Sequence, residues 1–180
     1  GYDPENPTGE GMIKWINSEA GGTTIAYNAA SKTVTADAGN FKGDVVNIIP
    51  PQKAGKIAFS AGLTNDTGWC PINGKTFEAT IHKNIHVIGD SSISKPMPKS
   101  GYAANSQAKV CAAAVVAMLK GDGAPTPSYV NTCYSIIAPG DGISVAMVYA
   151  YDESEGKIIK VKGSGGLTPG EFDPVLRERE

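Results

Sequence analysis

The chain has 180 residues, enough for one domain or two small ones. Its 41% hydrophobic and 19% charged residues are typical of a folded globular protein, and its formal net charge of −2 argues against a general nucleic-acid binder. No apolar run reaches the ~20 residues that a membrane-spanning helix needs. We therefore expect neither a nucleic-acid partner nor a membrane span.

Strand signals dominate the first half of the chain. Segments rich in β-branched residues alternate with turn residues, and two of them are close enough in sequence to form a hairpin through a turn at 28–32. Residues 1–10 are rich in proline and glycine and predict a loop, and residues 12–16 could form a short strand or a helical turn. Strands are predicted at 23–27, 33–36, 44–49, 75–80 and 85–88, with the apolar run 44–49 expected to be buried.

Two helices are expected. Residues 52–61 predict a short helix, and Gly62 follows it in a position that suits a C-terminal cap. An alanine-rich segment, 102–120, predicts the long helix, with Ser100 as its N-cap and Gly121 at its end. Its second half is apolar on every side, so we expect it to be buried on most faces.

The last third of the chain has a different character. Residues 122–128 are rich in glycine and proline and predict a linker. Strands are predicted at 129–137, 143–151 and 157–162, joined by turn-forming residues, and the chain from 163 onward is expected to be loop. This pattern predicts a β-meander that forms a layer of its own.

Metal binding is not predicted. The three cysteines, Cys70, Cys111 and Cys133, match no zinc-binding spacing, and an odd number cannot all pair within the chain. His82 and His86 would share a face only on a helix, whereas the pattern around His86 predicts a strand.

A candidate nucleotide site follows from the middle of the chain. Gly89 and Asp90 end the predicted strand 85–88, and the predicted long helix begins shortly afterwards. Ligands of open α/β sheets bind outside the carboxyl ends of the strands, and a helix N-terminus offers free N–H groups to electron-rich atoms. The plainer alternatives are that Gly-Asp only starts a turn and that the helix is an ordinary core helix. No G-x-G-x-x-G sequence is present.

Several segments together resemble the flavoprotein subunit of flavocytochrome c sulfide dehydrogenase. The resemblance covers almost the whole chain and is weakest in the first forty residues. The most specific segments are Pro-Met-Pro-Lys-Ser at 96–100 and Asn-Thr-Cys-Tyr-Ser at 131–135. Further matching segments lie at 46–52, 54–58, 63–66, 68–71, 86–90, 105–110 and 128–135.

The resemblance implies a fold that combines α/β with α+β structure. Members of that family use two dinucleotide-binding domains of the FAD/NAD-linked reductase type and a C-terminal interface domain. Residues 1–50 would then be the tail of the NADH-like domain, 51–123 the C-terminal segment of the FAD-binding domain, and 124–180 an incomplete interface domain with the β-meander. The family's other half would carry the first glycine-rich loop, the flavin-linking cysteine and one redox cysteine, so this chain alone is not expected to hold FAD or oxidise sulfide.

The resemblance also implies roles for the middle segment. The Asp90 carboxylate, after Gly89, would accept a hydrogen bond from a ribityl hydroxyl of FAD. Gly101, Tyr102, Ala103 and Ala104 would open the helix whose positive end faces the flavin ring and stabilises the reduced anion. Lys99, which precedes that helix, would add its positive charge at the cofactor site; the alternative is an ordinary solvated lysine.

Cys133 would be the catalytic residue, as one half of a redox disulfide that sulfide attacks. The simpler alternative is a buried strand cysteine. Electrons would pass to a c-type cytochrome subunit, and the location would be periplasmic. A sulfide:quinone reductase-like enzyme and a non-catalytic module that docks a partner subunit remain the two other functions to weigh.

Overall fold

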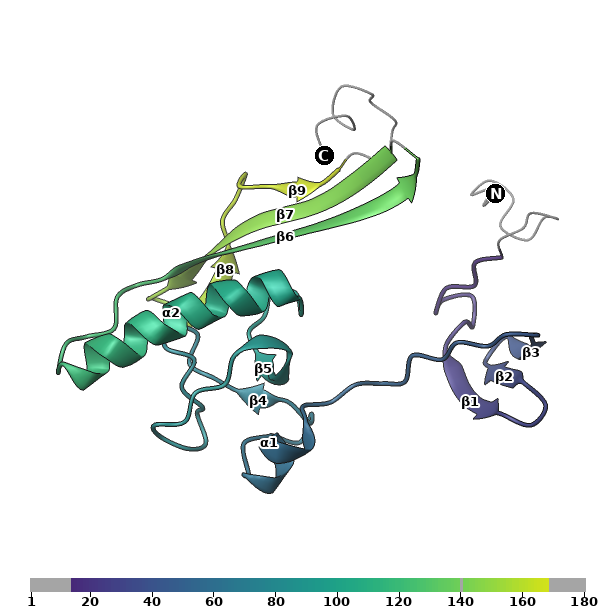
Figure 1. Cartoon of the computed structure of the whole chain (residues 1–180), viewed down its shortest axis with the longest axis horizontal. Helices are drawn as coiled ribbons and strands as arrows, with labels where there is room; N and C mark the ends of the chain where they lie inside the picture. The colour runs from purple at the N-terminus through teal and green to yellow at the C-terminus, as the bar shows by residue number, and fades with distance from the viewer. Residues whose placement is uncertain (1–13, 140, 169–180) are drawn as a thin grey trace. The chain divides into compact units, whose positions relative to one another are not determined.

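The computed structural model describes residues 14–139 and 141–168 (Figure 1). The chain divides into two compact units, one ending at Pro51 and one beginning at Gln52. The fold is a mixture of helices and mainly antiparallel sheets. This confirms the mixed α and β composition, whereas the two-domain dinucleotide-binding fold stays a prediction.

The first unit contains a three-stranded antiparallel sheet. Strand β1 (Thr24–Asn28) pairs with β2 (Thr33–Ala36), as the predicted hairpin requires, and β2 pairs with β3 (Gly39–Lys42). The third strand was not predicted, because glycine and asparagine at its start are depleted in strands. Residues 14–16 are irregular, whereas residues 12 and 13 and the predicted loop 1–10 lie outside the described part of the chain.

The prediction of a buried strand at 44–49 is wrong. This segment has no strand partner, and Val45 and Ile49 are 91% and 79% exposed. Apolar residues form a buried strand only where neighbouring strands supply hydrogen bonds and a covering layer. The described part of the first unit offers neither to this segment.

The second unit begins with short elements. Helix α1 (Lys56–Ser60) is shorter than predicted, because the N–H of Ala54 is bonded to the carbonyl of Gly68 rather than to a helical partner. Gly62 follows α1 with a φ of +66°, which agrees with its predicted capping position. Two-residue strands β4 (Cys70–Pro71) and β5 (Ser92–Ile93) pair in parallel, and β5 follows a 3₁₀ turn, η1 (Gly89–Ser91).

Two further strand predictions are wrong. Residues 75–80 and 85–88 form only isolated bridges, between Ile72 and Ala79 and between Glu78 and His86. The backbone turns sharply at Phe77, where the amide donates to the carbonyl of Asn73 and φ is +60°. A ladder cannot pass through such a turn, so Asp90 lies in η1 and does not end a strand.

Helix α2 (Gly101–Leu119) confirms the predicted long helix, with Ser100 as its N-cap and Gly121 beyond its end at a φ of +79°. The prediction that it is buried on most faces is wrong. Only three of its residues are buried: Ala103, Gln107 and Ala114. Leu119 is 83% exposed, because within the described residues only β6 and η1 pack extensively against the helix.

The β-meander is confirmed. Strands β6 (Ser128–Ala138), β7 (Asp141–Asp152) and β8 (Lys157–Lys160) are antiparallel and pair in chain order after the linker at 122–127. The prediction that only loop follows residue 163 is wrong in one place, because β9 (Gly166–Leu167) pairs with β7. Figure 1 shows the β6–β7 hairpin crossing α2 and continuing beyond the helix.

The main core lies between α2 and the meander. It contains six buried residues: Phe77, Met97, Ala103, Tyr129, Tyr149 and Ile158. Residues 129, 131 and 133 alternate with solvent-facing ones on β6, so they share the face that packs on α2. The free edge of β6 is held to the helix by Ser106, whose hydroxyl accepts from the N–H of Val130 at 3.1 Å.

The buried phenol of Tyr129 makes alkaline stability testable. Its hydroxyl donates to the carbonyl of Gly74, and burial, followed by the charge of Tyr151, raises the pKa of Tyr129 well above its usual range. The folded state therefore keeps the proton where the unfolded chain loses it, so this contribution is complete below about pH 10 and is lost as pH rises above it.

We expect Tyr129→Phe to lower the free energy of unfolding by about 1 kcal/mol at neutral pH. The deficit should shrink or vanish near pH 11, because phenylalanine cannot ionise. Urea denaturation at both pH values checks this, with the exposed Tyr134→Phe as a control on the same strand. A deficit that is the same at both pH values would contradict it.

Within the described ranges, none of the helices combines the length and the apolar character that crossing a lipid bilayer requires.

Candidate functional site

The first turn of α2 presents free hydrogen-bond donors. The N–H of Ala103 donates to the Ser100 hydroxyl at 3.1 Å, and the N–H of Ala104 donates to the Ser100 carbonyl. The N–H groups of Gly101 and Tyr102 have no acceptor among the described residues, and both residues are exposed. A helix of this length carries partial positive charge at this end, so the turn suits an electron-rich ligand atom.

The 3₁₀ turn η1 packs against the start of α2. The N–H of Gly89 donates to Oε1 of Gln107 at 2.7 Å, and Nε2 of Gln107 donates to the Ser94 hydroxyl at 3.1 Å. Gly89 has a φ of +71°, and a Cβ there would lie 3.4 Å from Cβ of Ala104. The structure therefore brings Gly89 and Asp90 beside the helix N-terminus, as the candidate nucleotide site requires. Asp90 is exposed to solvent.

Sequence reasoning did not identify Gln107. It is only 1% exposed and connects η1 and the loop after β5 to the second turn of α2. In the sequence, Gln107 is only one polar residue in an alanine-rich helix, and nothing in this pattern indicates that it is buried or bonded. Its importance follows from the two backbone segments that pack against it, which are far from it in sequence.

Lys99 is fixed by three neighbours. Its ammonium group donates to the carbonyl of Asp90 and to the carbonyl of Ser92, the latter at 3.2 Å, and lies 3.7 Å from the ring centre of Trp69. Burial lowers the pKa of Lys99, and the nearby charge of Asp90 partly opposes this effect. Lys99 is an exposed residue whose ammonium group is nevertheless bonded to two carbonyls and stacked on an aromatic ring.

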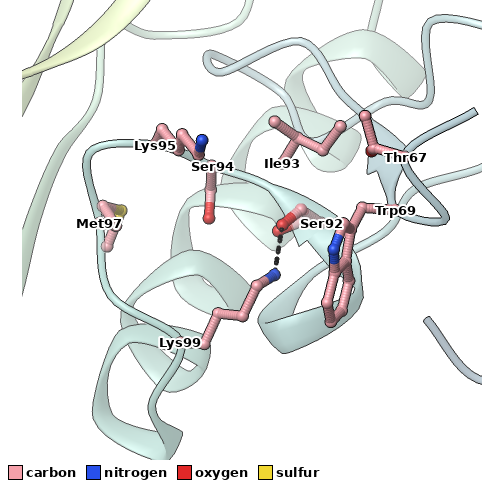
Figure 2. A pocket seen from close by; sticks show the side chains of 8 residues that line it. All are labelled: Thr67, Trp69, Ser92, Ile93, Ser94, Lys95, Met97 and Lys99. Atoms are coloured by element: carbon pink, nitrogen blue, oxygen red, sulfur yellow. Dashed lines mark hydrogen bonds between the residues drawn. The ribbon is translucent and has the colours of Figure 1, made fainter. Parts of the chain in front are cut away.

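A pocket of about 350 Å³ opens beside Lys99. Figure 2 shows its lining residues, with the Lys99 amine bonded to Ser92 and the Trp69 ring alongside. The lining residues are Thr67, Trp69, Ser92, Ile93, Ser94, Lys95, Met97 and Lys99. An aromatic wall with two lysines suits a planar or anionic ligand group. Trp69 is half-buried, packs against the small core around Cys70, and also faces this pocket.

Cys133 lies on β6 on the same face as the buried core residues, and it is half-buried. Its sulfur is a free thiol, 3.5 Å from Nδ2 of Asn131. Asn131 is fully buried, and its Oδ1 accepts from the Ser100 hydroxyl at 2.5 Å. The N-cap of α2 is therefore joined through one amide side chain to the candidate redox sulfur.

The other two cysteines are Cys70 and Cys111. Burial raises the pKa of Cys70, which Lys99 partly opposes, and burial alone raises the pKa of Cys111. Both are free thiols that would resist forming the reactive thiolate. In the part of the chain that the structure describes, no three histidine, cysteine, aspartate or glutamate side chains gather closely enough to hold a metal ion.

The geometry thus joins three groups at one end of α2: the η1 turn with Asp90, the free amides of Gly101 and Tyr102, and, through Asn131, the thiol of Cys133. Comparison with protein families adds one finding. Residues 125–180 match the family model described as flavocytochrome c sulphide dehydrogenase, flavin-binding. The matched segment includes β6 with Cys133 and the rest of the meander, and it spans about a third of the chain.

Proposed function

We propose, from the match of residues 125–180 to the flavin-binding family model of flavocytochrome c sulphide dehydrogenase, that this chain is part of an FAD-dependent sulfide dehydrogenase. The family match supports a flavoprotein oxidoreductase. The observation that carries the finer assignment is the link from Cys133 through Asn131 to the N-cap of α2. A redox sulfur and a ring-binding helix N-terminus must lie close together if electrons are to pass between sulfur and flavin.

The residues around the start of α2 fit a flavin. Gly101 and Tyr102 offer two backbone donors that have no partner in the described part of the chain, and the space that a Cβ at Gly101 would enter is open. Asp90 offers an exposed carboxylate for a ribityl hydroxyl, and Lys99 adds a fixed positive charge. When bound, FAD supplies an acceptor for two electrons, and positive charge at this helix end favours its reduced anion.

Cys133 is proposed to form a redox disulfide with a second cysteine that is not in this sequence. The hydrosulfide ion attacks one sulfur of that disulfide, so a new S–S bond forms a persulfide and the old S–S bond breaks. The other cysteine leaves as a thiolate and carries the electron pair of the broken bond. The half-buried position of Cys133 leaves its sulfur accessible for this exchange.

The whole protein is proposed to pass its electrons to a c-type cytochrome subunit in the periplasm. The name of the family supports the cytochrome partner, and the location is an extension of the same proposal. The domain assignment also belongs here: residues 1–50 in the NADH-like domain, 51–123 in the FAD-binding domain and 124–180 in the interface domain. Together these make the chain the C-terminal part of a larger flavoprotein.

A visible absorption spectrum of the whole protein tests this function. We expect a flavin spectrum that bleaches when sulfide is added without oxygen, and haem reduction when the cytochrome is present. Asp90→Ala should lower the flavin content, while Asp122→Ala, at an exposed residue beyond the far end of α2, should not. A colourless protein would favour the docking module, and sulfide-driven reduction of quinone in place of cytochrome would favour the quinone reductase.

A further inference from the structure

We infer that Asn131 is a positioning residue for the Cys133 thiol. The inference rests on the proposed function of Cys133 and adds a residue through which α2 acts on that sulfur. It begins from burial. Asn131 is 0% exposed, and a fully buried amide must satisfy its hydrogen bonds within the protein because it has no access to water.

Both ends of the Asn131 side chain reach the sulfur, and one also reaches the helix cap. Oδ1 accepts from the hydroxyl of Ser100 at 2.5 Å and from the Cys133 thiol at 3.8 Å, and Nδ2 lies 3.5 Å from Sγ of Cys133. The Ser100 hydroxyl donates to Oδ1 of Asn131 and accepts from the N–H of Ala103, so it joins the amide oxygen to the cap of α2. With Oδ1 bonded at the cap, the NH₂ group of Asn131 lies toward the sulfur.

Strand geometry keeps this arrangement constant. Residues 131 and 133 lie two apart on β6, so both side chains point to the face that packs on α2. Their cross-strand partners are Met147 and Val145, which are not hydrogen-bond donors through their side chains. Cys133 therefore receives a donor from Asn131, and the orientation of that donor is set by the helix cap.

The consequence for chemistry concerns the thiolate. A hydrogen bond from a neutral amide stabilises a sulfur anion and holds it on one side of the strand. Ser100 and the first turn of α2 lie at the other end of the same hydrogen-bond chain, at the positive end of the helix. Asn131 thus connects the sulfur to the helix end at which the flavin is proposed to bind.

The test uses the whole protein after reduction of its disulfides. The S–H stretching band of Cys133, identified by its loss in Cys133→Ala, reports on the hydrogen bond that the thiol donates to Oδ1 of Asn131. We expect the near-isosteric Asn131→Leu to move this band toward the frequency of an unbonded thiol. Thr132→Val, on the neighbouring residue of β6 that faces the other way, should leave it in place.

A second measurement follows the alkylation of Cys133 by iodoacetamide, located by peptide mass spectrometry. We expect Asn131→Leu to slow it about fivefold, the factor that one hydrogen bond of ordinary strength provides. Cys111 serves as the internal control thiol and should react at its usual rate. Ser100→Ala should slow alkylation of Cys133 less, because Asn131 then loses only the bond that orients it. The double variant should react at the same rate as Asn131→Leu alone.

An unmoved S–H band in folded Asn131→Leu would overturn the inference. Where that variant does not fold, Ser100→Ala replaces it, and an unmoved band there overturns the inference as well. Effects of the two substitutions that simply add would also overturn it, since they would show that Ser100 does not act through Asn131. Neither measurement uses flavin or sulfide turnover, so failure of the proposed function would be seen separately.

Discussion

Replacing Cys133 by serine in the whole protein is expected to abolish sulfide-driven flavin reduction while the flavin stays bound. Serine keeps the size and position of the side chain on β6 but cannot form a disulfide. Sulfide would then have no S–S bond to attack. We expect a loss of at least about 10⁴-fold in the rate of reduction, the order of effect seen when a catalytic nucleophile is removed. Anaerobic stopped-flow absorption at the flavin band measures it.

The matched control is Cys111→Ser on α2. Cys111 is also half-buried, and it packs against the core without a contact to the proposed site. Sulfide should reduce the flavin of Cys111→Ser at nearly the rate of the parent protein. If sulfide also reduces the flavin of Cys133→Ser at the parent rate, Cys133 is only a packing residue of β6, and the catalytic assignment is wrong.

The second large effect concerns stability. Phe77 is 0% exposed and packs edge-on against Tyr129, with ring centres 5.9 Å apart. Its carbonyl also accepts from the N–H of Val87, which holds the segment that leads to η1. We expect Phe77→Ala to lower the free energy of unfolding by about 3–5 kcal/mol, because a large cavity forms and the aromatic contact is lost. The positive φ at this position is about equally unfavourable for phenylalanine and alanine, so it does not change the expected difference.

A loss of this size is a large part of the 5–15 kcal/mol that typically stabilises a whole domain, at order of magnitude. Hydrogen exchange of the amides in α2 and β6 measures it locally. Ile57→Ala on α1 provides the control, since Ile57 is 81% exposed and should change the free energy of unfolding by less than about 0.5 kcal/mol. Unchanged exchange in Phe77→Ala would show that the core between α2 and the meander does not depend on this ring.

The parts of the fold that could be predicted are those that local sequence determines. Helix α2 has a capping serine, a long alanine-rich stretch and a terminating glycine, and each acts within a few residues of its neighbours. The meander has alternating strands and tight turns, so its pairing follows from chain order. These elements were predicted nearly to their ends.

The errors arose where structure depends on distant neighbours. The apolar run 44–49 resembles a buried strand, but a strand forms only where another strand pairs with it. Residues 85–88 failed for a related reason, because the turn at Phe77 prevents a ladder from forming beside them. In both segments the composition was correct for a strand, and the missing partner decided the outcome.

The candidate site shows the same division. Gly89, Asp90 and the start of α2 could be predicted as neighbours, because a short stretch of sequence joins them. Gln107 and Asn131 could not, since their partners are 18 and 31 residues away and each looks like an ordinary polar residue in its own element. A buried amide is recognised only when the groups on both of its ends are known.

The uncovered apolar side chains affect how this polypeptide behaves in concentrated solution. Leu119 and Ile136 are more than four-fifths exposed, and the net charge of −2 provides little electrostatic repulsion between molecules. Contact between such surfaces removes their apolar side chains from water and favours aggregation. Producing the chain together with a polypeptide that covers these side chains should therefore raise its yield in the clarified extract.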